Sequence, residues 1–185
     1  MKLSAKTRVS TTKGVVKQSR REKNIPAVIY SPGSPAQSIE VNGVEFDAVM
    51  RNMKQGRLAT TIFTLDLDGK PVKAIVKDIQ YNLTNYQVIH LDFEELKDDT
   101  PVKVKVPVEC VGEAECVGIK LGGVMRQVIR QVKVKCLPKD IPAEFELDIQ
   151  ELKMKQVKRL SDIVMPKGVK PIAATDEVVV VIAKR

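Results

Sequence analysis

The first half of the chain alternates short apolar runs with turn residues, a pattern typical of a strand-rich unit with a few helices. Its clearest feature is a hairpin, because two β-rich runs flank Asp68-Gly69, a dipeptide that favours tight two-residue turns. Turn residues at 31–35 and 82–85 separate further apolar runs. The predicted strands cover residues 3–9, 26–30, 38–41, 60–67, 72–79 and 86–93.

Two short helices are predicted between these strands. A polar loop at 10–14 leads into residues 15–21, where a helix would display Lys17 and Arg21 on one face, four residues apart. The second helix follows Asn42, a favoured N-cap residue, with Glu45 at the third position as in a capping box. Its apolar stripe, which we expect to face the core, consists of Val44, Phe46, Val49, Met50 and Met53.

The second half of the chain is predicted to be mainly β. A polar break at 97–101 precedes residues 102–109, in which valines alternate with other residues as in a half-buried strand. Further strands are predicted at 128–136, 145–149 and 178–182. The apolar residues of the first of these strands are expected on one face: Val128, Val132, Val134 and Cys136.

Two segments of the second half are not predicted as strands. The glycine-rich residues 118–123 are expected to form a loop, and residues 151–163 fit either a turn or a short helix. We therefore predict an α+β fold that is mainly β, with an N-terminal domain at 1–95 and a second β-rich domain at 96–185.

The composition indicates a globular protein with a mainly aliphatic core. The chain has 185 residues, of which 43% are hydrophobic and 29% charged, and this composition excludes wholesale disorder. It has no Trp, three Tyr and four Phe, so it lacks a row of aromatics on which single-stranded nucleic acid could stack. The single His excludes zinc sites with paired histidines and haem held by two histidines.

No catalytic motif is visible in the sequence. Three cysteines, Cys110, Cys116 and Cys136, lack C-x-x-C spacing and are expected to be small buried hydrophobes in a reducing compartment, with a reactive thiol as the alternative. Residues 118–123 lack the spacing of a phosphate-binding loop, and the acid pairs at 94–95 and 98–99 are expected to be linker charges. We predict a protein that is not an enzyme and has no cofactor or metal.

No membrane-spanning or targeting segment is expected. The longest apolar run, residues 178–183, is far shorter than the ~20 residues that cross a bilayer. The N-terminus is basic but lacks the apolar core of a signal peptide. These patterns predict a cytoplasmic protein that does not bind membranes.

The positive charge is concentrated at the N-terminus. Residues 1–23 contain eight basic residues and one acid, so they carry +7 of the net charge of +8. Such a cluster attracts phosphate backbones through Coulomb attraction and counterion release. A solvated basic terminus without a partner is the alternative, whereas membrane binding would need an apolar face that these residues lack. Residues 96–185 have 17 bases and 13 acids, and the sequence shows no dominant cluster among them.

His90 and Asp92 are two polar residues of the predicted strand at 86–93. Because alternate residues of a strand point to the same side, Ile89, Leu91 and Phe93 are expected inside and the His–Asp pair outside. One interpretation is an ordinary exposed polar face. The other is an RNA-facing pair, in which the carboxylate accepts from a guanine amino group and the imidazole donates to a phosphate, a base or a 2′-hydroxyl.

Three segments of the chain resemble one ribosomal protein family. Residues 20–30, Arg-Arg-x-x-x-Ile-Pro-Ala-Val-Ile-Tyr, resemble the early signature of the bacterial large-subunit ribosomal protein family numbered twenty-five. Val-Lys-Asp-Ile-Gln at 76–80, followed by His-Leu-Asp-Phe at 90–93, resembles its second signature. Residues 118–126, together with Gly112, are similar to the extra domain of the long form, called general stress protein CTC.

This resemblance implies a structural component of the large ribosomal subunit that binds 5S ribosomal RNA. It implies an N-terminal β-barrel docked on loop E of that RNA, a second β-rich domain, and a single copy beside neighbouring ribosomal proteins. An off-ribosome stress-response or protein-interaction module is the alternative. The residues that match the RNA-facing positions of the family are Lys13, Lys17, Arg20, Arg21, Tyr30, Gln80, His90 and Asp92.

The chain departs from the family pattern at two turns. Lys23 stands where the family has a glycine after the arginine pair, and Ser31 stands where it has one after the tyrosine. Both differences suggest an altered turn geometry, and Lys23 adds a positive charge that can attract phosphate.

Overall fold

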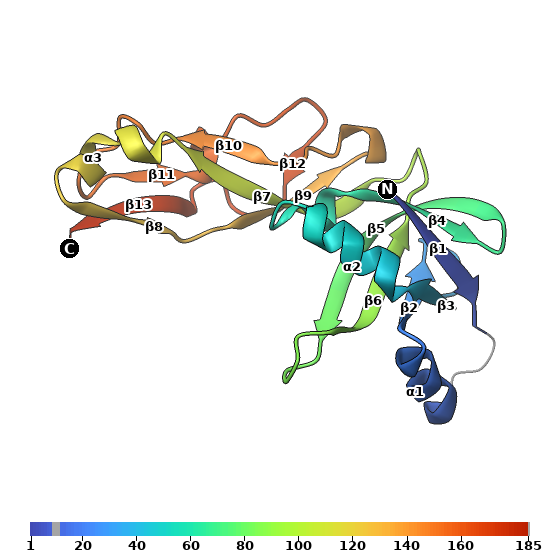
Figure 1. Cartoon of the computed structure of the whole chain (residues 1–185). Coiled ribbons are helices and arrows are strands. Elements are labelled where there is room, and N and C mark those ends of the chain that lie inside the picture. Colours follow the sequence, from blue (N-terminus) through green and yellow to red (C-terminus); the bar gives the residue numbers. More distant parts are fainter. Residues whose placement is uncertain (9–11, 185) are drawn as a thin grey trace. The chain divides into compact units, whose positions relative to one another are not determined.

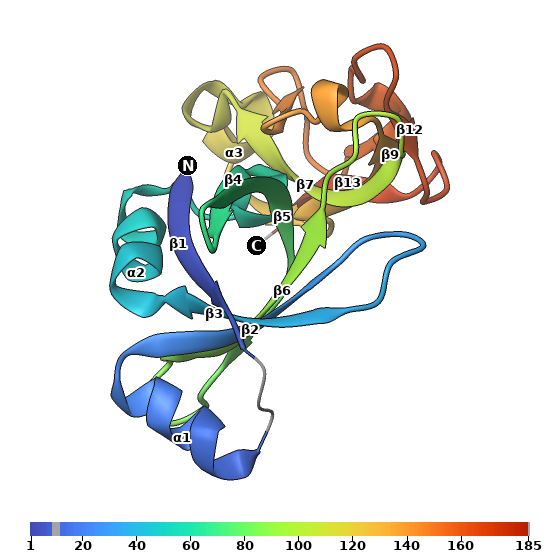
Figure 2. The ribbon, with the colours of Figure 1, turned by 90° about the vertical axis from the view of Figure 1, so that its right-hand side faces the viewer.

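Six strands from the first half of the chain close into a β-barrel in the computed structural model, which describes residues 1–8 and 12–184. Around the barrel the order is β1-β3-β2-β6-β5-β4, and closure comes from the parallel pairing of β1 with β4 (Figures 1 and 2). The strands are β1 (Lys2–Thr7), β2 (Asn24–Tyr30), β3 (Gln37–Asn42), β4 (Ile62–Leu67), β5 (Lys70–Tyr81) and β6 (Val88–Glu95). The mainly β fold with an N-terminal barrel is thus confirmed.

The chain divides into two compact units, Met1–Asp98 and Asp99–Arg185, called the N-terminal and C-terminal units below. The polar break predicted at 97–101 spans this division. In the part of the chain that the structure describes, no helix is long and apolar enough to cross a membrane.

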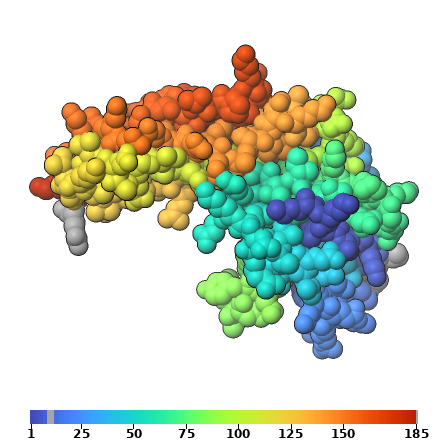
Figure 3. Space-filling view, turned by 45° about the horizontal axis from the view of Figure 1, so that its top comes forward, coloured from blue at the N-terminus to red at the C-terminus, as the bar shows by residue number. Residues whose placement is uncertain are grey.

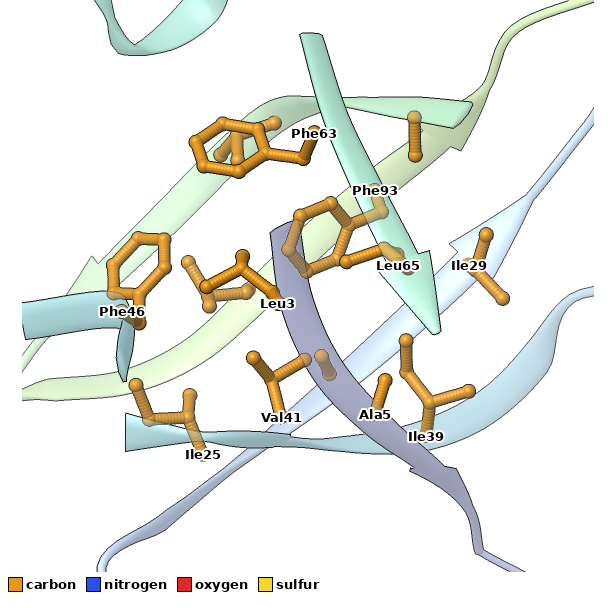
Figure 4. Close-up of a cluster of buried hydrophobic side chains, with 14 residues drawn as sticks. Leu3, Ala5, Ile25, Ile29, Ile39, Val41, Phe46, Phe63, Leu65 and Phe93 are labelled. Atoms are coloured by element: carbon orange, nitrogen blue, oxygen red, sulfur yellow. The ribbon is translucent and has the colours of Figure 1, made fainter. Parts of the chain in front are cut away.

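The barrel interior holds three phenylalanines among aliphatic side chains (Figure 4). Phe46, Phe63 and Phe93 are fully buried, and the rings of Phe63 and Phe93 meet edge to face with centroids 6.3 Å apart. Such an aromatic contact adds to the stability that burial of the apolar area provides. The other buried side chains of this core are Leu3, Ala5, Ile25, Ala27, Ile29, Ile39, Val41, Leu65, Ala74, Val76 and Leu91.

Helix α2 (Gly43–Asn52) begins at the predicted cap. The Asn42 Oδ1 accepts hydrogen bonds from the backbone nitrogens of Val44 and Glu45, at 3.0 and 3.3 Å. The Glu45 carboxylate accepts from the Ser4 backbone N–H at 2.8 Å and the Ser4 hydroxyl at 3.0 Å, so it joins α2 to β1. The prediction that Val44 faces the core with the rest of the apolar stripe is wrong, because its side chain is 56% exposed.

Several boundaries in the N-terminal unit differ from the prediction. Helix α1 (Lys13–Arg21) starts two residues early, inside the predicted loop, and β1 ends at Thr7. Residues 9–11, which include the predicted strand end Val9, lie outside the described residues. Strand β6 starts at Val88 because Tyr86 has a φ of 55°, a left-handed conformation that does not fit a strand. A 3₁₀ turn, η1 (Arg57–Thr60), precedes β4.

The C-terminal unit contains two sheets. A four-stranded sheet has the order β10-β7-β9-β12, and a three-stranded sheet has the order β11-β13-β8. The predicted alternation of 102–109 is confirmed, since Val102, Val104 and Val106 are buried. The strands are β7 (Val102–Val111), β8 (Gly123–Gln127), β9 (Gln131–Cys136), β10 (Phe145–Asp148), β11 (Val157–Arg159), β12 (Lys170–Pro171) and β13 (Val178–Lys184). The short helices are η2 (Glu113–Glu115), α3 (Val117–Lys120), η3 (Pro138–Asp140) and η4 (Leu160–Asp162).

Three predictions for the C-terminal unit are wrong. The strand predicted at 128–136 begins only at Gln131, because Val128, which is 64% exposed, lies in the connection between β8 of one sheet and β9 of the other. The glycine-rich 118–123 contains the end of α3 and the start of β8 rather than only a loop. Residues 151–163, expected to be a turn or a short helix, contain the strand β11 as well as the short helix η4, because residues 157–159 pair with β13.

We predict that Gly43→Ala destabilises the N-terminal unit by about 1–3 kcal/mol, as overpacking does. A Cβ at Gly43 would lie 2.4 Å from the carbonyl oxygen of Lys23, so the turn before β2 would have to move. Gly14→Ala is the control, because no atom lies within 4 Å of its added Cβ and alanine favours the helix. Thermal unfolding of the two variants measures this, and equal stabilities would contradict the packing argument.

Candidate nucleic-acid interface

Helix α1 presents basic side chains from the outside of the barrel, next to β2 (Figure 2). Ser19 is its buried residue, and its hydroxyl lies 2.6 Å from the Glu40 carboxylate on β3. Because this contact turns one side of the helix inward, the basic residues remain exposed on the other sides. The exposed basic residues of α1 are Lys13, Lys17, Arg20 and Arg21.

Arg20 connects α1 to the barrel. Its Nη2 donates to the backbone carbonyl of Ile89 on β6, at 3.0 Å. This bond holds the guanidinium beside the strand that carries His90, while its other N–H groups can still donate to an external partner. The only acid within residues 1–23, Glu22, accepts a hydrogen bond from Gln18 at 2.9 Å.

The polar side chains on β2, β5 and β6 form one outer surface of the barrel, called the strand face. The register places Gln80 of β5 directly opposite His90 of β6, and Tyr30 of β2 opposite Glu94. Leu91 and Phe93 point inward, so the predicted alternation of β6 holds at these positions. The prediction that Ile89 is buried with them is wrong, because the register shifts near this end of the strand and Val88 packs against the core instead. The strand face consists of Tyr30, Lys77, Asp78, Gln80, His90, Asp92 and Glu94.

His90 and Asp92 lie together on this face. The Nδ1 of His90 is 2.8 Å from the Oδ1 of Asp92, and both side chains remain partly exposed, at 24% and 34%. Because Nδ1 lies against the carboxylate, Nε2 is the ring nitrogen left for an external partner. The two side chains therefore lie together on the strand face without a ligand.

Tyr30 lies among the carboxylates of the strand face. Its pKa is raised above 10, first by burial and then by the negative charges of Asp92, Glu94 and Asp78. The phenol therefore stays neutral at physiological pH and keeps its O–H as a hydrogen-bond donor. Although three acids lie near it, the Tyr30 hydroxyl can donate a hydrogen bond to an electronegative atom of a ligand.

A β-bulge in β5 determines which residues join the strand face. The register of β5 against β6 shifts between Val76 and Asp78. The next inward-facing residue after Val76 is therefore Ile79, and both Asp78 and Gln80 point outward. Lys77 also reaches this side, since its Nζ is 2.6 Å from the Glu94 carboxylate.

Sequence reasoning missed three of these residues. Lys77 and Asp78 were not predicted as site residues, and Glu94 was expected to be a linker charge. The signal for Lys77 and Asp78 was the spacing of the apolar residues, because Val76 and Ile79 are three residues apart instead of the two that a regular strand requires. Glu94 is the next outward position after Asp92 on β6, so its place also followed from the alternation.

A hollow of about 620 Å³ adjoins α1 on the N-terminal unit. Arg20, Lys23 and Arg51 contribute positive charge to its wall, and Tyr86 lies at the tip of the β5–β6 hairpin. Figure 3 shows α1 in blue and this hairpin tip in light green as separate projections.

The two family glycine positions differ in conformation. Lys23 has a φ of 61°, so it adopts the left-handed conformation that a glycine would take without strain. Ser31 is buried without a positive φ, and its hydroxyl has no hydrogen-bond partner in the described structure. The altered turn geometry suggested by the sequence is therefore not seen at Lys23, where the lysine keeps a glycine-like turn.

The cysteines show no sign of an activated thiol. Cys116 and Cys136 are buried, and Cys110 is half-buried. The pKa of the Cys110 thiol is raised by burial and by the charge of Glu113, which lowers its thiolate fraction at neutral pH. Within residues 1–8 and 12–184, no group of three or more His, Cys, Asp or Glu side chains is placed to hold a metal.

Comparisons with known proteins match both units. The model of the ribosomal L25p family matches residues 3–93, and the model of the C-terminal domain of ribosomal protein TL5 matches residues 101–185. The chain is 46% identical to the large ribosomal subunit protein bL25 of Chlamydia trachomatis serovar L2, over all 185 residues of both proteins. The bL25 proteins of Chlamydia muridarum and Chlamydia pneumoniae are 45% and 43% identical over the same full length.

We predict that Asp92→Asn lowers the pKa of Tyr30 while leaving it above 10, because burial is the larger cause of the shift. Because the pKa of Tyr30 is higher in the folded than in the unfolded protein, raising the pH past 10 ionises the unfolded state first. Tyr30 therefore lowers the stability of the fold only above that pH. Ultraviolet titration, with Tyr30→Phe identifying the signal, measures the pKa. Asp66→Asn on β4 is the control that should leave it unchanged. An unchanged pKa in Asp92→Asn would show that the two side chains do not interact.

Proposed function

The chain belongs to the ribosomal L25p family, and from this premise we propose that its N-terminal unit binds 5S ribosomal RNA within the large ribosomal subunit. Members of the family are structural ribosomal proteins rather than enzymes, which agrees with the prediction of a non-catalytic protein. Full-length identity to large-subunit proteins favours this role over an off-ribosome module. The proposed contacts are Lys13, Lys17, Arg20, Arg21, Tyr30, Gln80, His90 and Asp92.

The observation that carries the proposal is the placement of two different surfaces side by side. Helix α1 carries exposed basic side chains, and Arg20 bonds to β6 next to His90. Basic side chains supply affinity for phosphates without reading sequence. The strand face supplies directed donors and acceptors, so it can distinguish one RNA surface from another.

Asp92 is the residue that a surface for simple charge attraction would lack. A carboxylate facing a polyanion is repelled by it, unless it accepts a hydrogen bond from a base amino group. The His90 Nδ1 lies 2.8 Å from one oxygen of this carboxylate, so an imidazole and a carboxylate stand side by side on the strand face. This arrangement fits a guanine amino group, the donor that G·C pairs present in the minor groove.

The shape of the strand face suits a double-stranded segment of RNA. A-form RNA has a wide and shallow minor groove that displays base edges and 2′-hydroxyls, and a rigid sheet surface can approach it. Gln80 and the neutral Tyr30 hydroxyl add groups that can bond to these 2′-hydroxyls or to phosphates. Stacking on aromatic side chains is not required for this mode.

We predict that Arg20→Ala combined with Arg21→Ala weakens 5S RNA binding and flattens its salt dependence. Each lost phosphate contact should reduce the slope of log affinity against log salt by about one. The control is Lys2→Ala with Lys70→Ala, which removes the same charge from exposed positions outside α1 and the strand face. Equal slopes for the wild type and the arginine variant would mean that these arginines do not contact phosphate.

We predict that Asp92→Ala weakens binding by about 1–3 kcal/mol with little change in salt slope, because a directed base contact is lost. His90→Ala should give a smaller loss. Asp66→Ala is the matched control, since it removes an exposed acid from β4 and should leave binding unchanged or slightly tighter. Circular dichroism checks the fold, and tighter binding by folded Asp92→Ala would refute base recognition at this residue.

A further inference from the structure

The four-stranded sheet of the C-terminal unit carries lysines on its exposed side. Strand pairing places Lys103 opposite Lys135 and Lys105 opposite Lys133, and Lys170 lies opposite Lys135 on the other side of β9. These five residues, which are all exposed, form the lysine face. The sequence brings them from three separate segments, so the count of 17 bases and 13 acids concealed the cluster.

The lysine face opposes folding rather than assisting it. Residues opposite each other on neighbouring strands have Cβ atoms about 5 Å apart, and like charges at that separation destabilise a sheet. The alternation of the strands requires buried residues such as Val104 and Val134 on the inner side, but it does not require lysine outside. Threonine, or pairs of opposite charge, would serve the sheet better.

The positive charge of four of the five lysines is not neutralised within the described part of the unit. No ion pair joins Lys105, Lys133, Lys135 or Lys170 to a carboxylate among the described residues. The acids of the same sheet lie toward the far end of β7, where Glu109 is opposite Glu146 of β10. The sheet is thus divided into a basic end and an acidic end, and the basic end offers a surface for an anion.

We propose that the lysine face binds the phosphate backbone of ribosomal RNA, as a contact separate from the one on the N-terminal unit. Lysine is a flexible point charge with three donors, which suits phosphates but provides little base recognition. The face has no aromatic side chain, and lysine is depleted from protein–protein interfaces, whose binding energy comes from aromatic and arginine anchors. The charge pattern therefore favours RNA over an acidic protein surface.

The test uses the full chain and a generic RNA duplex of 20 base pairs that lacks loop E. The test variant combines Lys133→Gln with Lys135→Gln, and Lys120→Gln with Lys153→Gln removes the same charge elsewhere in the unit. Both are made in the background of Arg20→Ala and Arg21→Ala, which reduces the contribution of the N-terminal site equally in the two variants. Binding is measured at several salt concentrations.

We expect the test variant to bind the duplex about tenfold more weakly for each lost contact at 0.1 M salt, with the salt slope reduced by about two. Lys133→Arg with Lys135→Arg should keep the affinity. The glutamine variant should unfold at the same temperature or higher, because repulsion across β7 and β9 is relieved. A loss of binding with retained stability therefore supports a direct contact.

Two results would overturn the proposal. Equal affinity losses in the test and control variants would show that only net charge matters. If the test variant keeps its affinity for RNA but loses affinity for polyglutamate, the face is a site for acidic protein segments instead.

Discussion

The parallel pairing of β2 with β6 is the constraint on which the candidate RNA surface depends. This pairing places Val28 beside Asp92 and Tyr30 beside Glu94, and the antiparallel β5 brings Gln80 opposite His90. Because the strands belong to a closed barrel with Leu91 and Phe93 packed inside, a shift of register would carry the polar side chains into the core. The aliphatic and phenylalanine core thus maintains the geometry of the outer surface.

Helix α1 and the strand face meet opposite electrostatic requirements. The helix concentrates positive charge where a polyanion can be attracted, whereas the strand face keeps three carboxylates beside a tyrosine. Attraction alone would be stronger without those acids. Their presence is consistent with a division between affinity, supplied by α1, and discrimination, supplied by Asp92 and its neighbours. The Arg20 bond to the Ile89 carbonyl connects the two surfaces at a single point.

Local signals in the sequence predicted much of the fold, and pairing over long distances accounts for most of what they missed. Asp68-Gly69 marked its hairpin and Asn42 marked the start of α2, because both act through neighbouring backbone atoms. The His90–Asp92 pair followed from strand periodicity. The bulge that turns Asp78 outward depends on the partner strand, and the lysine face depends on which strands pair. Val128 was misplaced because exposed apolar residues also occur in connections.

The central claim is that 5S ribosomal RNA docks on α1 and the strand face together. Mapping backbone amide NMR shifts of the full chain, with and without this RNA, tests the claim directly. We expect the largest changes in α1, at Tyr30, at Gln80 and along residues 89–92, with α2 and the β4–β5 turn nearly unaffected. Shifts confined to α2 or to that turn would contradict the account, because they would place the RNA on another side of the barrel.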